Sequence, residues 1–264
     1  MRLLQVLSIL LTQLSVGTLL GSSTLPPREI RASFFQFNAL FSALTAALAL
    51  VFAKWLLAWA WADVRFLGLT VIGATAAYGC FRLDKPIFGR LLMILSGIAG
   101  LILGLLPLAH RSLQVRDIHT SARWIFDAGV LAGTLLLGAT HVGMVLGHWY
   151  LLMRRLSFVY LWRFSQLLVG AVALRLLLLL ACFAVLREQD PAFAETFIAN
   201  LFAWQGNLLF FCLRVVAGIV APLVLSVMIL RCVTEKANQA ATGLLYVTEI
   251  SVLFGELFAA YLLI

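Results

Sequence analysis

The chain has 264 residues, of which 63% are hydrophobic and only 11% are charged, and its mean hydropathy is +1.06. A soluble fold of this size has too little polar surface to cover so many apolar side chains. The composition therefore argues against a soluble enzyme, a disordered chain and a disulfide scaffold. It predicts an all-α, polytopic integral membrane protein, because the period-two alternation of a membrane barrel is absent.

The formal net charge of +8 would suggest nucleic-acid binding in a soluble domain. Here most Lys and Arg residues lie between apolar runs, where they set topology and contact lipid headgroups. We therefore expect a lipid bilayer, and not nucleic acid, as their partner. The cysteines lack a CxxC spacing, which indicates structural thiols rather than a metal site or a disulfide framework; they are Cys80, Cys182, Cys212 and Cys232.

A bilayer core about 30 Å thick needs about 20 apolar residues in a helix. The apolar runs predict a single transmembrane domain over residues 1–264, which could divide into two four-helix halves joined at 108–123. The first run could be a signal peptide, but its polar residues Gln5, Thr12 and Gln13 favour a span retained among other helices. The eight expected spans are 3–21, 34–53, 65–80, 87–107, 124–149, 160–186, 207–230 and 240–263.

Lys and Arg are more frequent in the connections after the first, third, fifth and seventh spans than on the opposite side. The positive-inside rule then places both termini outside the cytoplasm. We expect the membrane to be a bacterial-type inner membrane. The longest connection, 187–206, holds several charged residues and is expected to form an external amphipathic segment.

Ionisable side chains inside the spans are the strongest functional signal, because a charge near the midplane costs at least about 2.5–3.5 kcal/mol. Counting residues at 1.5 Å each places His141 with Glu249 in one layer and Arg214 with Glu256 in another, with Arg175 between the layers. Buried ion pairs that only fix helix register are the structural alternative. The deep set as a whole favours a polar pocket between the last four spans.

A quinone or quinol headgroup would suit such a pocket, because its oxidation and reduction need proton donors and acceptors. We expect His141, Arg175, Tyr246 and Glu249 to surround the headgroup. Glu249 and Glu256 are seven residues apart and share a helix face, so Glu256 with Arg214 could continue a proton route outward.

Haem b is disfavoured as a cofactor, although Met144 could still ligate it. His141 and His148 share one helix and cannot hold an iron from opposite sides, while His110 and His119 are expected in a loop. The same stretch also suits helix packing, because Gly143 and Gly147 form a small-xxx-small pattern. No covalently attached or metal cofactor is predicted.

The last run contains Ala-Thr-Gly-Leu-Leu-Tyr at 241–246 and Leu-Phe-Gly-Glu-Leu at 253–257. These segments and the span count resemble quinol-interacting membrane anchor subunits of the DmsC/NrfD type. The resemblance implies eight helices and partner subunits that carry iron–sulfur clusters or haem.

The sequence therefore predicts a multi-pass membrane subunit of a respiratory or photosynthetic-type electron-transfer complex, with a quinone pocket and a proton route. As an enzyme it would be at most a non-catalytic or quinol-interacting subunit of an oxidoreductase. A proton-coupled transporter of small solutes is the alternative, and a structural assembly subunit is the third. Hydrolysis within the membrane is disfavoured, because no span contains a GxSxG or HExxH motif.

Overall fold

The computed structural model describes residues 2–56, 59, 61–112, 120–153, 157–189, 191–202 and 208–262. They contain eight helical stretches that are long and apolar enough to cross a membrane. Each stretch overlaps one expected span with ends that differ by a few residues, so the all-helical, polytopic architecture is confirmed. The stretches are Leu3–Ser23, Ala32–Trp55, Val64–Arg82, Pro86–His110, Trp124–Leu152, Val159–Val185, Leu208–Thr234 and Asn238–Leu262.

Three of the spans contain a π-helical segment, which we label η. The described elements, in chain order, are α1 (Arg2–Ser23), α2 (Ala32–Val51), η1 (Phe52–Leu56), α3 (Trp61–Arg82), α4 (Pro86–Ala99), η2 (Gly100–Leu105), α5 (Leu106–Ser112), α6 (Thr120–Leu152), α7 (Val159–Gln189), α8 (Pro191–Phe202), α9 (Leu208–Val215), η4 (Val216–Val220), α10 (Ala221–Thr234) and α11 (Asn238–Leu262).

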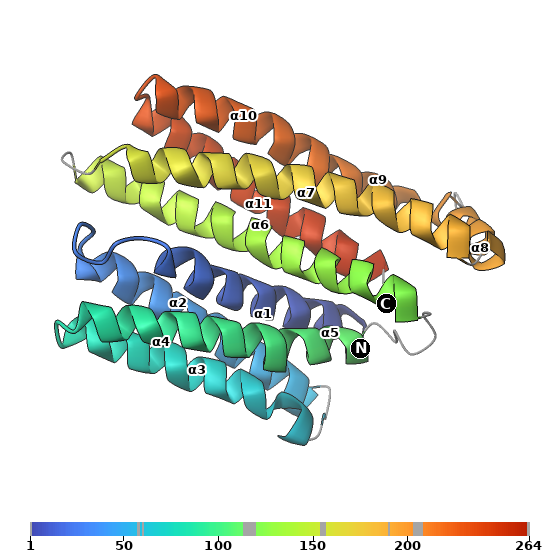
Figure 1. Cartoon of the computed structure of the whole chain (residues 1–264), viewed down its shortest axis with the longest axis horizontal. Coiled ribbons are helices and arrows are strands. Elements are labelled where there is room, and N and C mark those ends of the chain that lie inside the picture. The colour runs from blue at the N-terminus through green and yellow to red at the C-terminus, as the bar shows by residue number, and fades with distance from the viewer. Residues whose placement is uncertain are drawn as a thin grey trace.

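The helices run roughly parallel or antiparallel to one another and form two groups, α1–α5 and α6–α11 (Figure 1). The groups correspond to the two four-span halves that the sequence allowed. The N and C labels lie at the same end of the bundle as α8, and we call this the α8 end. Turns with left-handed residues reverse the chain at the other end, with φ of 54° at Asp84 and 60° at Lys236.

The two halves meet where α1 crosses α6 at a pair of glycines. A Cβ on Gly17 would lie 2.9 Å from the Gly138 Cα, and a Cβ on Gly138 would lie 2.3 Å from the Gly17 carbonyl oxygen. Only residues without side chains let two backbones approach this closely. The contact makes α1 and α6 the most enclosed spans, with 67% and 78% of their apolar windows buried.

A π-helical turn leaves backbone groups that need partners from outside the helix. In η4, the Ala217 carbonyl accepts a hydrogen bond of 2.8 Å from the Ser251 hydroxyl of α11. One residue further along, Gly218 lies against Gly255, where an added Cβ would be 3.0 Å from the Gly255 Cα. This close approach fixes α11 beside α9 and η4.

Two expected connections are shorter in the structure. The fourth span continues as α5 to Ser112, so the connection predicted at 108–123 narrows to the residues between α5 and α6. The sixth span continues as α7 to Gln189 and is followed by the short helix α8 within the segment expected at 187–206. Pro191 is suited to the first turn of α8, because a first-turn residue needs no N–H partner within the helix.

Candidate functional site

His141 of α6 and Glu249 of α11 form a buried pair near the middle of their spans. Their Nδ1 and Oε1 atoms lie 3.4 Å apart, and the residues are 3% and 6% exposed. The Phe41 ring of α2 covers the imidazole, with ring centroids 4.0 Å apart and nearly parallel planes. The expectation that His141 and Glu249 share one layer is confirmed by this contact.

Each partner of this pair also carries a buried polar atom whose hydrogen bond is not supplied within the described part of the chain. These atoms are Nε2 of His141 and Oε2 of Glu249. Buried polar atoms in folded proteins are nearly always hydrogen-bonded to protein or to ordered water. The pair therefore has unused capacity to bind a water, a proton or a polar ligand group.

Arg175 of α7 and Glu256 of α11 form a second buried pair. The Nη2 atom of Arg175 donates to Glu256 Oε2 over 2.6 Å, while its Nη1 atom donates to the Gly129 carbonyl of α6, also over 2.6 Å. The side chains are 11% and 4% exposed. In contrast to the His141–Glu249 pair, the guanidinium of this pair donates hydrogen bonds to two acceptors.

The expected pairing of Arg214 with Glu256 is wrong in detail. Glu256 forms its ion pair with Arg175 instead, and within the described chain Arg214 forms none. Arg214 lies on α9, close enough to Arg175 and Glu256 for an electrostatic interaction with each of them. Similar depth in the membrane suggested the pairing of Arg214 with Glu256, but the direction in which each side chain leaves its helix decides the partner.

Gln13 and Gly133 complete this second cluster and were not identified from the sequence. The Gln13 amide of α1 donates to the Val130 carbonyl of α6 over 3.2 Å. A Cβ on Gly133 would meet Glu256 Oε2 at 2.5 Å and Gln13 Nε2 at 2.9 Å, so both polar groups occupy the space that the glycine leaves. The sequence signals that could have identified them are a polar residue within the first apolar run and a glycine within the fifth.

His110 and Asp127 form a third pair near the α8 end. Their Nε2 and Oδ1 atoms are 2.5 Å apart, and the side chains are 20% and 30% exposed. The expectation that His110 lies in a loop is wrong, because apolar residues continue the helix through α5. His119 lies outside the described residues.

Other predicted site residues do not join these pairs. Tyr246 is 44% exposed on the outer face of α11, although Glu249 is only one helical turn away. The proposed contact of Tyr246 with a ligand at His141 is therefore not supported. Met144 packs against the hydrophobic core, and His148 is exposed.

The three pairs follow α6 inward from the α8 end. Counted from Asp127 at 1.5 Å per residue, Gly133 beside Glu256 lies about 9 Å further in and His141 about 21 Å. Each pair joins a carboxylate to a basic side chain, and two of the three basic side chains are imidazoles, whose ring nitrogens can donate or accept a hydrogen bond. The arrangement is suited to proton exchange between the α8 end and the bilayer centre.

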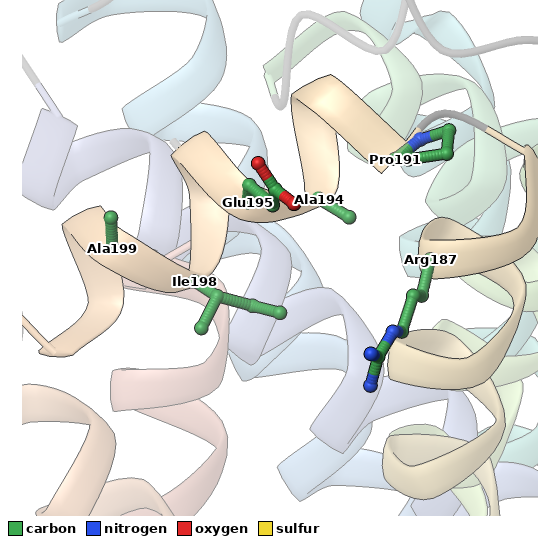
Figure 2. Close-up of a pocket in the computed structure, with 6 residues that line it drawn as sticks. All are labelled: Arg187, Pro191, Ala194, Glu195, Ile198 and Ala199. Carbon is green, nitrogen blue, oxygen red and sulfur yellow. The ribbon is translucent and has the colours of Figure 1, made fainter.

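Among the described residues, no cluster of three or more His, Cys, Asp or Glu side chains could hold a metal ion. A cavity of about 380 Å³ lies between the last turn of α7 and α8, and its described lining residues include no member of the three pairs (Figure 2).

Comparisons of the chain with protein-family models, with curated proteins and with solved structures gave no match.

Proposed function

We propose that the protein is a quinol-interacting membrane subunit of an electron-transfer complex, in which His141 and Glu249 exchange protons with the quinone headgroup. The proposal includes partner subunits bearing iron–sulfur clusters or haem, as the resemblance in the last helix implies. It also includes a bacterial-type inner membrane as the location. The cofactor bound by this chain would be quinone.

The proposal depends on the Nε2 and Oε2 atoms of the buried His141–Glu249 pair, which have no hydrogen-bond partner among the described residues. A quinone carbonyl accepts a hydrogen bond from an imidazole N–H, and a quinol hydroxyl donates one to a carboxylate. Both groups lie deep in the hydrocarbon, where the apolar quinone tail is soluble. The headgroup would reach the imidazole by displacing Phe41, which covers it.

The Arg175–Glu256 and His110–Asp127 pairs support a proton route from the α8 end to Glu249. Glu249 and Glu256 lie seven residues apart on α11, about 10.5 Å along the axis. One or more ordered waters would have to bridge that distance, and buried polar groups without protein partners commonly hold such waters.

A proton-coupled transporter of small solutes is the second candidate. One observation favours it: His141 belongs to the second half of the bundle, whereas the Phe41 ring stacked on it belongs to the first. A protonation site at the junction of two halves is what alternating access between them would use.

Equilibrium binding of tritiated short-chain ubiquinone and menaquinone to the purified protein tests the proposal. We expect saturable binding of one quinone class and of its quinol. His141→Ala should weaken binding of the oxidised quinone about tenfold through loss of one hydrogen bond, and Glu249→Gln should weaken binding of the quinol about tenfold through loss of the charged acceptor. Thr140→Val and Thr248→Val are the matched controls, because within the described chain these buried hydroxyls donate only to carbonyls of their own helices. The controls should bind as the wild type does.

Absence of saturable binding in the wild type, or equal binding in all variants, would contradict the quinone proposal. Proton uptake driven by a solute gradient in proteoliposomes, lost in Glu249→Gln, would then favour the transporter.

A further inference from the structure

Among the described residues that line the cavity at the α8 end, one is a cation, one is an anion and the others are apolar. Arg187 comes from the last turn of α7, and the other lining residues come from α8 (Figure 2). The cavity volume of about 380 Å³ lies within the range of sites for small ligands, roughly 300–1,000 Å³. The α8 lining residues are Pro191, Ala194, Glu195, Ile198 and Ala199.

The two charges do not neutralise each other. Arg187 and Glu195 line the same cavity, yet within the described residues neither forms an ion pair. Figure 2 shows the Arg187 side chain on α7 and the Glu195 side chain on α8, with the guanidinium and the carboxylate apart from each other. A ligand that carries both a negative and a positive group could contact both walls.

The end of the sixth span indicates that the cavity lies at the depth of lipid headgroups. Arg187 follows the end of the membrane-spanning stretch at Val185 by two residues. The helix α8 is short and mostly apolar, and its Ala194 and Leu201 side chains are buried. A short, mostly apolar helix directly after a span is suited to the membrane interface, where one face can meet lipid and the other the protein.

We propose that this cavity binds the headgroup of phosphatidylethanolamine. The lipid phosphate accepts hydrogen bonds from the Arg187 guanidinium, and the primary ammonium donates to the Glu195 carboxylate. Ile198 and Ala194 contact the apolar part of the lipid nearest the headgroup. Phosphatidylcholine has the same charges, but its quaternary nitrogen has no N–H to donate, so Glu195 selects the primary amine.

Native mass spectrometry of the intact chain in detergent tests the inference. The probes are phosphatidylethanolamine, phosphatidylcholine and phosphatidylglycerol with identical acyl chains, added at equal concentrations. We expect the wild type to retain phosphatidylethanolamine over phosphatidylcholine by about tenfold, the effect of one charge-assisted hydrogen bond. Glu195→Gln should remove this preference, and Arg187→Gln should weaken retention of both zwitterionic lipids.

Arg231→Gln and Glu235→Gln are matched controls, because both side chains are exposed near the end of α10 and neither lines this cavity. They should leave the preference unchanged. Equal retention of all three lipids would overturn the inference. Preferential retention of phosphatidylglycerol that depends on Arg187 alone would also overturn it, because Glu195 would then have no role.

Discussion

At the residue scale, the two pairs on α11 differ in how well their charges are satisfied. Arg175 donates to both Glu256 and the Gly129 carbonyl, which is the arrangement of a structural ion pair. The His141–Glu249 pair keeps a buried atom on each partner that has no hydrogen bond to any residue the structure describes. Unsatisfied polar atoms destabilise a fold by about 1–3 kcal/mol each, so retaining two of them points to a role other than stability.

A double-mutant cycle tests the Arg175–Glu256 pair. Glu256→Gln should destabilise the protein by about 3–5 kcal/mol, because it leaves the Arg175 cation buried without a counter-charge. Arg175→Met together with Glu256→Gln should lose less than the two single losses added, with a coupling of about 0.5–3 kcal/mol. The free energy of unfolding in mixed detergent micelles is the measurement.

The same cycle with Arg214→Met is the control for that prediction. Arg214 interacts with Glu256 only at longer range, so its coupling should be smaller. Additive losses for Arg175 and Glu256, or a larger coupling between Arg214 and Glu256, would show that Arg175 is not the ion-pair partner of Glu256.

The residues that sequence reasoning placed correctly are those fixed by depth. His141 and Glu249 meet because both lie near the midplane and no other carboxylate is predicted in that layer. Glu256 was assigned the wrong arginine because depth does not specify which face of a helix meets a neighbour. Gln13 and Gly133 were missed because their roles depend on the crossing of α1 and α6, which residue counting does not give.

At the element scale, span length is set by bilayer thickness, and for this reason the eight spans could be predicted closely from apolar runs. The ends were less predictable because helices continue past the hydrocarbon. The α5 and α7 helices extend into segments that the composition assigned to connections. The π-helical segments gave no sequence signal, since they depend on partners such as the Ser251 hydroxyl on the Ala217 carbonyl.

The glycine crossing of α1 and α6 predicts a sharp response to one added methyl group. Gly138→Ala would place a Cβ 2.3 Å from the Gly17 carbonyl oxygen, a backbone atom that cannot rotate away. We expect a loss of about 1–3 kcal/mol in the free energy of unfolding, the usual cost of overpacking.

Gly170→Ala is the matched control for Gly138→Ala, because a Cβ on Gly170 of α7 has no neighbour within 4 Å. Alanine is the better helix former, so this variant should be neutral or slightly stabilising. Equal stability of the two variants would show that the helices cross elsewhere.

At the scale of the whole molecule, the two halves meet along α1 and α6, and the polar pairs lie along the same central helix. The His110–Asp127 pair lies near the α8 end, the Arg175–Glu256 pair lies deeper, and the His141–Glu249 pair lies near the middle. This order supports a proton route that ends at a hydrogen-bonding site in the hydrocarbon. A quinone would meet that site from the lipid phase, and the electrons would pass to partner subunits.

Infrared difference spectroscopy of the protein with bound quinone, recorded as the quinone is reduced and reoxidised, tests this account most directly. Proton exchange between Glu249 and the quinone predicts a carboxylic-acid C=O band that appears as the quinone changes redox state and shifts in deuterated water. The band should disappear in Glu249→Gln and remain in Thr248→Val. A band that persists in Glu249→Gln, or a wild-type protein whose bound quinone changes redox state with no carboxyl signal, would contradict this proton exchange.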